Sequence, residues 1–388
     1  MTGNKTCAIA LILALFLLHL ACNKVTAPAP ENVSPKAVQT NEPERPAQPD
    51  NTDRSGGPVR IGYFHGGRIH LLYRAYINNY FDNEKVEVKF LSKGLPPAED
   101  KLFEVPKSHP EMDKKIRDIF YFGRVTGLEI VKEIEKGNLD GGTIGESSFL
   151  ASIARGAPII AVAMLGHDSK EKPGKGIVLR KGLKINSPED LKDKTFTYRL
   201  SGPGDGIFLR EFILSQGIKL DQVKIIDDMI DYKQAETLKS GQVDGGFYHF
   251  HWAKKFIEDD IGYLYRPMDW LNPEISHAVL VFHKDYLAKH QEEVQKIVNG
   301  YVKRIKYEKD LPEEELKNPR EFGLQMVNED MEEMTIPAYD LPPKMRLDLL
   351  EQMQDLLLKY GKASKKVRIT DFIDDSFVDR AMESMTGK

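Results

Sequence analysis

The chain has 388 residues, of which 41% are hydrophobic and 29% are charged, and its formal net charge is −4. A chain of this length exceeds what one hydrophobic core usually supports, so we expect about two lobes in an ordinary globular protein. Acidic and basic residues are interspersed, which excludes the basic stripe that a nucleic-acid-binding surface needs.

Residues 1–21 are predicted to be a signal peptide. Their apolar run, AIALILALFLL at 8–18, is shorter than the roughly 20 residues that a membrane-spanning helix needs. The junction of Ala21 and Cys22 resembles the lipobox of bacterial lipoproteins, in which the cysteine is diacylated and becomes the new N-terminus. The resemblance implies an acyl anchor in a lipid bilayer and a location in the periplasm or at the cell surface. The alternative is a plain secretory signal in which Cys22 has no function.

Residues 22–57 are predicted to be a disordered tether. The segment is rich in Pro, Ala, Asn, Glu and Thr and lacks aromatic residues. It therefore cannot bury enough apolar surface to offset the entropy lost on ordering. The chain's two cysteines, Cys7 and Cys22, precede the folded body, which excludes a disulfide, a cysteine-based zinc site and a cysteine nucleophile there.

Strands and helices are predicted to alternate through the folded body. Periodicity and turn residues place strands at 59–64, 86–91, 157–165, 175–180, 195–200, 223–226 and 277–283. Helices are placed at 69–81, 123–136, 207–216, 232–239 and 343–360, with Ser187 as an N-cap and Gly361 after the last helix. Residues 92–117 form no clear pattern and are expected to be an inserted loop. The alternation predicts an α/β protein whose mostly parallel sheets are covered on both faces.

Two stretches, KGNLDGGTIGESSF at 136–149 and SGQVDGGFYHFHWA at 240–253, repeat one pattern. Each has a glycine, a polar residue and an aliphatic residue before Asp-Gly-Gly, and each then continues with different polar or aromatic residues. In open α/β sheets, ligands bind beyond the carboxyl ends of the strands, where the strand order reverses. We therefore interpret the two stretches as equivalent strands of two similar lobes, whose different tails line opposite walls of one cleft.

The chain resembles bacterial ABC-transporter substrate-binding proteins of the nitrate/sulfonate/taurine and thiamine-precursor-binding type, the SsuA/THI5-like family. The resemblance is carried by GNLDGGTIGESSFLASIARGAPIIAVAML at 137–165, INSPEDLKDKTFTY at 185–198 and SGPGDGIFLREFILSQGIKLDQVKIID at 201–227. Asp193 stands where members of the family usually have glycine.

The resemblance implies a two-lobed periplasmic-binding-protein fold of type II, with the ligand cleft between the lobes. The order of predicted elements places lobe 1 at 58–184, lobe 2 at 185–275, and the return to lobe 1 with the C-terminal helices at 276–388. The resemblance also implies a ligand that is a sulfonate, a nitrate-like anion, or an amino-acid-like or pyrimidine-like compound. The protein would deliver this ligand to an ABC permease in the inner membrane.

Loops that follow predicted strands supply the candidate ligand contacts. Glycine amides can face a ligand, arginine can clamp a carboxylate, sulfonate or phosphate, and serine and histidine offer hydrogen bonds. The candidates are His65, Gly66, Gly67 and Arg68 after the first strand, Ser147 and Ser148 after the first Asp-Gly-Gly strand, Ser201, Gly202, Gly204 and Asp205 in SGPGDG, and Tyr248, His249 and His251 in FYHFHW.

Each candidate also has a structural interpretation. Arg68 is then a solvated residue, the serines and Asp205 are helix N-caps, and the histidines belong to the buried first turn of a helix. Glu146 would repel an anion if it faced the cleft. His249 and His251 could bind a metal together with His65, His70 or His167, although we expect neither a metal nor a cofactor.

The expected function is ligand binding without catalysis or nucleic-acid contact. One alternative is a ligand-sensing lipoprotein that does not transport. Another is an enzyme on the same fold, of the thiamine-pyrimidine type. That enzyme resembles this family but needs a cysteine cluster, which the chain lacks.

Overall fold

The computed structural model describes residues 56–63, 67–93, 102–105, 107, 126–171, 173–199, 202–229, 231–311 and 337–386. The predicted signal peptide, Cys22 and nearly all of the predicted tether lie outside these residues. No helix within the described ranges is long and apolar enough to cross a membrane. The described residues form two β-sheets with helices and belong to one compact unit, Gln48–Lys388.

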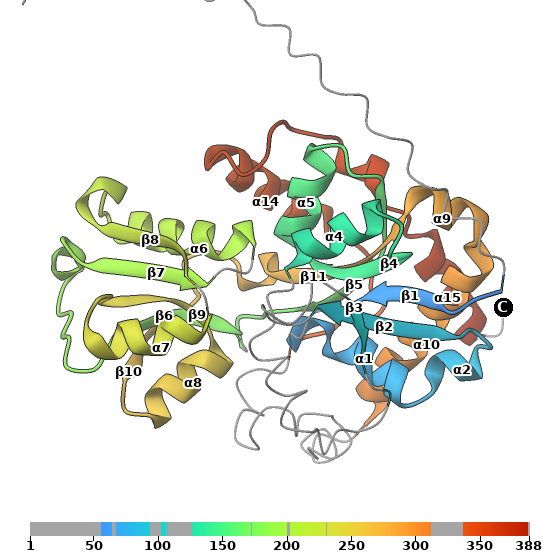
Figure 1. Cartoon of the computed structure of the whole chain (residues 1–388), viewed down its shortest axis with the longest axis horizontal. Coiled ribbons are helices and arrows are strands. Elements are labelled where there is room, and N and C mark those ends of the chain that lie inside the picture. The colour runs from blue at the N-terminus through green and yellow to red at the C-terminus, as the bar shows by residue number, and fades with distance from the viewer. Residues whose placement is uncertain are drawn as a thin grey trace, which may run out of the picture. The chain divides into compact units, whose positions relative to one another are not determined.

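The first sheet has six strands in the order β3-β2-β1-β4-β11-β5 (Figure 1). Their bounds are β1 Val59–Gly62, β2 Val88–Lys93, β3 Leu102–Glu104, β4 Gly141–Gly145, β5 Ile159–His167 and β11 His277–His283. β1 pairs in parallel with β2 and β4, whereas β11 runs antiparallel between β4 and β5. β11, the last of these strands in the sequence, therefore lies inside the sheet beside the edge strand β5.

The second sheet has five strands in the order β10-β6-β9-β7-β8. Their bounds are β6 Lys175–Arg180, β7 Thr195–Arg199, β8 Lys224–Met229, β9 Gly245–His249 and β10 Gly262–Pro267. β7 pairs in parallel with β8 and β9, and β6 runs antiparallel between β9 and β10. Apart from β3, the two sheets thus share one plan, with β7, β8, β9, β6 and β10 in the places of β1, β2, β4, β11 and β5.

The two Asp-Gly-Gly stretches occupy equivalent positions in this plan, at the start of β4 and β9. Asp140 accepts a hydrogen bond from the backbone N–H of Arg60 in β1 at 2.7 Å. Asp244 accepts one from the backbone N–H of Thr195 in β7 at 3.0 Å. Each aspartate also pairs with an arginine, Asp140 with Arg60 and Asp244 with Arg180. The repeated aspartate therefore fixes the start of the neighbouring parallel strand in both sheets.

Helices cover the faces of both sheets (Figure 1). One apolar cluster joins α4 and α5 on the first sheet with α6 on the second, and α14 packs into it. A second cluster packs α1, α10 and α15 on the other face of the first sheet, and a third packs α7 and α8 on the second sheet. The helices are α1 His70–Ile77, α2 Tyr80–Asn83, α4 Gly127–Glu135, α5 Glu146–Ala154, α6 Pro203–Ser215, α7 Asp231–Ser240, α8 Phe250–Glu258, α9 Lys284–Lys289, α10 Gln291–Asp310, α14 Leu347–Lys359 and α15 Ser376–Thr386.

The chain passes between the sheets twice within the described residues. The first crossing, 168–174, leads from β5 to β6, and the return crossing, 268–276, leads from β10 to β11. Strand 175–180 was assigned to lobe 1 from the sequence, but β6 is hydrogen-bonded in the second sheet. β6 is the first strand after the first crossing, just as β11 is the first strand after the return crossing.

Two local predictions differ from the structure, and the structure explains a third observation, the departure from the family's glycine at Asp193. The helix expected at 69–81 is divided into α1 and α2 because Asn79 has a left-handed φ of 62°. The loop expected at 92–117 contains β3, which pairs antiparallel with β2. Asp193 has a φ of 60°, the left-handed region that favours glycine, so the residue usual in the family suits this turn.

Candidate functional site

The amino ends of α5 and α6, which follow strands of different sheets, face each other directly. A Cβ atom at Gly204 would lie 2.9 Å from the hydroxyl of Ser147, and one at Gly202 would lie 3.1 Å from that of Ser148. Gly202 is the residue before α6 and has a φ of 136°, which side chains rarely adopt. The serine and glycine candidates from the two predicted loops are therefore in contact across the two sheets.

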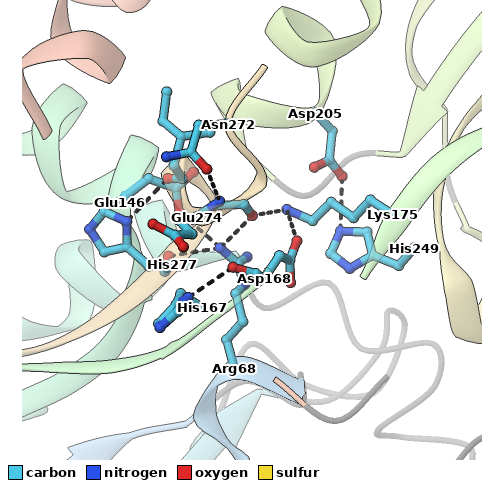
Figure 2. A network of polar contacts seen from close by, with 12 residues as sticks. Arg68, Glu146, His167, Asp168, Lys175, Asp205, His249, Asn272, Glu274 and His277 are labelled. Atoms are coloured by element: carbon cyan, nitrogen blue, oxygen red, sulfur yellow. Dashed lines mark hydrogen bonds and ion pairs between the residues drawn. The ribbon is translucent and has the colours of Figure 1, made fainter. Parts of the chain in front are cut away.

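A buried ion pair lies beside these helix ends. Arg68, in the 3₁₀ turn Gly67–Ile69, donates from Nη1 to Oε2 of Glu146 at 2.9 Å. The same nitrogen donates to Ser276 Oγ at 3.0 Å and to the carbonyl oxygen of His277 at 2.7 Å. Glu146 is thus neutralised by Arg68 and is not a free acid in a cleft (Figure 2).

A second pair joins the first crossing to β6. Lys175 Nζ lies 3.8 Å from Asp168 Oδ2, donates to Ser276 Oγ, and sits 5.1 Å from the centre of the Phe208 ring. Burial raises the pKa of Asp168, while Lys175 and Arg68 oppose this rise. Burial also lowers the pKa of Lys175, and Arg68 adds to the lowering. The pair is therefore held in a site where charge is costly.

A third group lies at the end of β9 and the start of α6. His249 Nε2 is 3.4 Å from Asp205 Oδ2, and Arg199 Nε is 3.8 Å from the same oxygen. Burial lowers the pKa of His249 to about 3, with Arg199 adding to the effect. Burial alone would raise the pKa of Asp205, but His249, Lys175 and Arg199 hold it below its ordinary value. At neutral pH we therefore assign an ionised Asp205 and a neutral His249.

His277 is fully buried at the first position of β11, where its Nδ1 donates to the carbonyl oxygen of Ile275 at 3.1 Å. Burial lowers the pKa of His277 to about 3, and Arg68 adds to the lowering. Nδ1 of the neighbouring His167 donates to the carbonyl oxygen of Asp168 at 2.8 Å. Burial lowers the pKa of His167, but the carboxylate of Asp340 outweighs it and raises the pKa overall.

The buried His277 predicts a pH dependence of stability. Below about pH 6.5 the unfolded chain binds a proton at this histidine that the folded chain does not, so stability falls as the pH falls. The slope is about 1.4 kcal/mol per pH unit until the pH approaches the folded value. Replacing His277 by asparagine should therefore remove about 1 kcal/mol of the loss between about pH 7 and about pH 5.5.

Urea denaturation of the wild-type protein and His277→Asn at the two pH values measures this difference. His167 has a raised pKa and acts in the opposite sense, so the comparison, not the absolute slope, isolates His277. Equal pH dependence of the two proteins would mean that folding does not lower the pKa of His277.

The structure places the predicted site residues in three ways. Arg68, Ser147, Ser148, Gly202, Gly204, Asp205 and His249 converge on the network just described, and Gly67 begins the turn that carries Arg68. Tyr248 instead lies in the core, with its ring 5.1 Å from that of Phe256 in an edge-on contact, and its hydroxyl has no hydrogen-bond partner among the described residues. His65, Gly66, Ser201 and the side chain of His251 lie outside what the structure describes.

Two structural interpretations can now be corrected. The residue before α6 is Gly202, and Asp205 lies at the third helical position, so Asp205 is not the N-cap. Arg68 is not a solvated residue, because its guanidinium is paired and its side chain is only 15% exposed. In the described part of the chain, no group of three or more His, Cys, Asp or Glu residues is placed to hold a metal ion.

Sequence reasoning missed Lys175, Arg199, Ser276 and His277 as members of the network. From the sequence, Lys175, Arg199 and His277 are only parts of the predicted strands 175–180, 195–200 and 277–283. The available signal was position, since Lys175 and His277 each begin a strand directly after a crossing. The partner of a buried charge cannot be found along the chain when it is contributed by the other sheet.

Comparison with known proteins agrees with this architecture. The NMT1/THI5 like family model matches residues 125–315. A ligand-binding component of an ABC-type import system from Staphylococcus aureus, solved with zinc bound, has a TM-score of 0.60 at 16% identity and covers 83% of this chain and 98% of its own. The alkanesulfonate-binding protein SsuA from Xanthomonas axonopodis pv. citri, bound to MOPS, has a TM-score of 0.60 at 14% identity, with 83% and 99% covered. No curated protein matches the chain.

An enzyme shares the fold. The desulfurization enzyme DSZB has a TM-score of 0.52 at 14% identity and covers 84% of this chain and 99% of its own. The fold is therefore compatible with both binding and catalysis. The fold predicted from the sequence and the resemblance to the SsuA/THI5-like family are confirmed. Residues 125–315 thus match the NMT1/THI5 like family model, and the chain has the fold of a periplasmic binding protein.

Proposed function

We propose that the protein is the solute-binding component of an ABC importer, anchored to a bilayer through an acylated Cys22. It captures a small polar molecule between the two sheets and delivers it to a permease in the inner membrane. In this proposal residues 58–184 and 276–388 form one lobe and residues 185–275 the other, except that β6 at 175–180 is counted with the second lobe because it pairs in the second sheet.

One observation carries the proposal. The amino ends of α5 and α6 come from equivalent sheets and meet beside the two crossings, with Ser147 and Gly204 in contact. Helix amino ends offer unpaired N–H donors, and the nearby hydroxyls and charged groups can orient a polar ligand. The proposed contacts are Arg68, Ser147, Ser148, Gly202, Gly204, Asp205 and His249, with His65, Gly66, Gly67, Ser201 and His251 as further candidates and Tyr248 as support behind them.

The proposed ligand is a small polar compound of the sulfonate, nitrate-like, amino-acid-like or pyrimidine-like class. The sulfonate class is supported by the similar SsuA structure bound to MOPS. The mixture of cations and carboxylates around the helix ends also suits ligands that carry both signs of charge.

Two other functions remain candidates, and each has its own test. A ligand-sensing lipoprotein would bind the same compounds. It would not support their uptake into vesicles that contain an ABC permease encoded by a neighbouring gene. An enzyme is favoured by the DSZB fold, yet both cysteines of this chain lie at positions 7 and 22, before the described residues. Turnover of a sulfinate or a thiamine precursor would establish catalysis.

A thermal-shift screen of sulfonates, nitrate, amino acids and pyrimidines tests ligand binding. A ligand at 100 times its dissociation constant adds about 2.7 kcal/mol to the free energy of unfolding, so a true ligand should raise the melting temperature clearly. His249→Ala should reduce this shift because it removes a proposed contact. His283→Ala is the matched control, since His283 lies at the opposite end of β11 from the network.

Each variant is compared with its own ligand-free melting temperature, so a change in baseline stability does not affect the reading. A library without any stabilising compound would contradict the proposal. Equal shifts in the wild-type protein, His249→Ala and His283→Ala would contradict the assigned contacts but not ligand binding.

A further inference from the structure

The two crossings between the sheets meet at one buried serine. Ser276 is the last residue of the return crossing and has no exposed surface. Its backbone carbonyl accepts a hydrogen bond from the N–H of Asp168 in the first crossing at 3.0 Å. At the other end of the crossings, the backbone N–H of Met268 donates to the carbonyl oxygen of Lys175 at 2.9 Å. The crossings are therefore joined by their backbones at both ends.

The hydroxyl of Ser276 is shared by cations that belong to different sheets. Arg68 donates to Oγ at 3.0 Å from the turn that follows β1, in the first sheet. Lys175 donates to the same oxygen from the first position of β6, in the second sheet. Figure 2 shows Arg68 and Lys175 in this network, with Asp168 beside them and a dashed line that joins Lys175 to Asp168.

Sharing one acceptor makes the contact sensitive to the relative position of the sheets. A hydroxyl hydrogen bond weakens steeply outside a narrow range of distance and angle. Rotation of one sheet relative to the other changes the separation of Arg68 and Lys175. Oγ can therefore accept hydrogen bonds from both cations only near the present arrangement of the sheets. When the bond to Lys175 is lost, the buried ammonium keeps Asp168, at 3.8 Å, as its one charged partner within ion-pair distance among the described residues.

We propose that the Ser276 hydroxyl is a latch that holds the two sheets in the arrangement of this structure before any solute is bound. Ser276 is a positioning residue that acts through Arg68 and Lys175. The latch concerns the ligand-free chain and does not depend on which solute the protein binds. Its failure and the failure of the proposed function can therefore be told apart.

Hydrogen exchange and small-angle X-ray scattering of the full chain, without added solute, test the latch. In Ser276→Ala, amides in 168–175 and 268–277 should exchange about tenfold faster, because their crossings open more often while the sheets stay folded. The radius of gyration should increase in the same variant. Peptides from β1, β4 and β7 should exchange as in the wild-type protein.

A double-mutant cycle tests whether Ser276 acts through Lys175. Lys175→Met keeps the length of the side chain, removes the ammonium and should accelerate the same peptides. Both changes remove the same hydrogen bond, the one between Lys175 and Ser276. The double variant should therefore exchange no faster than the more affected single variant. If the accelerations of exchange in the two single variants multiply in the double variant, Ser276 does not act through Lys175.

Ser152→Ala is the matched control. Ser152 is also fully buried, but its hydroxyl has no hydrogen-bond partner in the part of the chain that the structure describes, so its removal should leave exchange and scattering unchanged. Wild-type exchange at the crossings in Ser276→Ala would overturn the latch. A uniform acceleration in all peptides would also overturn it, because that is the result of a general loss of packing.

Discussion

Replacing Arg68 by methionine is expected to lower the free energy of unfolding by about 3 kcal/mol, because Glu146 is then left as an unpaired buried charge. Glu146 is only 2% exposed, and Arg68 is its only ion-pair partner among the described residues. Arg68 also serves Ser276 and the carbonyl oxygen of His277, so these acceptors lose a donor as well. Urea denaturation followed by circular dichroism measures the loss.

A matched control is available on the surface. Arg155 pairs with Glu135 through both terminal nitrogens, but its side chain is 40% exposed. Arg155→Met should therefore cost only about 0.5 kcal/mol, as exposed ion pairs do. Adding Glu146→Gln to Arg68→Met should recover part of the loss, because no buried charge then remains unpaired. Equal losses for Arg68→Met and Arg155→Met would contradict the argument from burial.

Patterns within single elements were sufficient to predict most of the fold. Strands 175–180 and 277–283 have the predicted bounds because both are apolar over most of their length and lie in sheet interiors. The repeated Asp-Gly-Gly stretches were correctly interpreted as equivalent strands, since β4 and β9 hold corresponding places in the two sheets. The break at Asn79 was not predicted, because a single left-handed residue inside an apolar helical pattern leaves no periodic signal.

A site residue was predictable only where it lies in the loop directly after a predicted strand. Asp205 and His249 were both proposed from their loops, and the structure brings them within 3.4 Å. Their proximity was not predicted, because it depends on the order of strands in the second sheet. Lys175 was missed for a related reason, since a charged residue at the start of an apolar strand resembles an exposed strand end.

Gly141→Ala and Gly245→Ala should each lower the free energy of unfolding by about 2 kcal/mol, because both glycines face a backbone oxygen that cannot retreat. An added Cβ would lie 2.5 Å from the carbonyl oxygen of Val281 in β11 at Gly141, and 2.6 Å from that of Val178 in β6 at Gly245. These carbonyls belong to the antiparallel strands that occupy equivalent positions in the two sheets. The steric cost should therefore be similar at both positions.

Gly57→Ala is the control for these variants, because an added Cβ there would have no heavy atom within 4 Å. Alanine also reduces the entropy of the unfolded chain, so this control should be neutral or slightly stabilising. Urea denaturation of the three variants, followed by circular dichroism, measures the differences. A large loss at Gly141 with none at Gly245 would mean that β4 and β9 are not packed alike. The shared plan of the two sheets would then not extend to the strands that lead into the candidate site, and the contact of α5 with α6 would need a separate explanation.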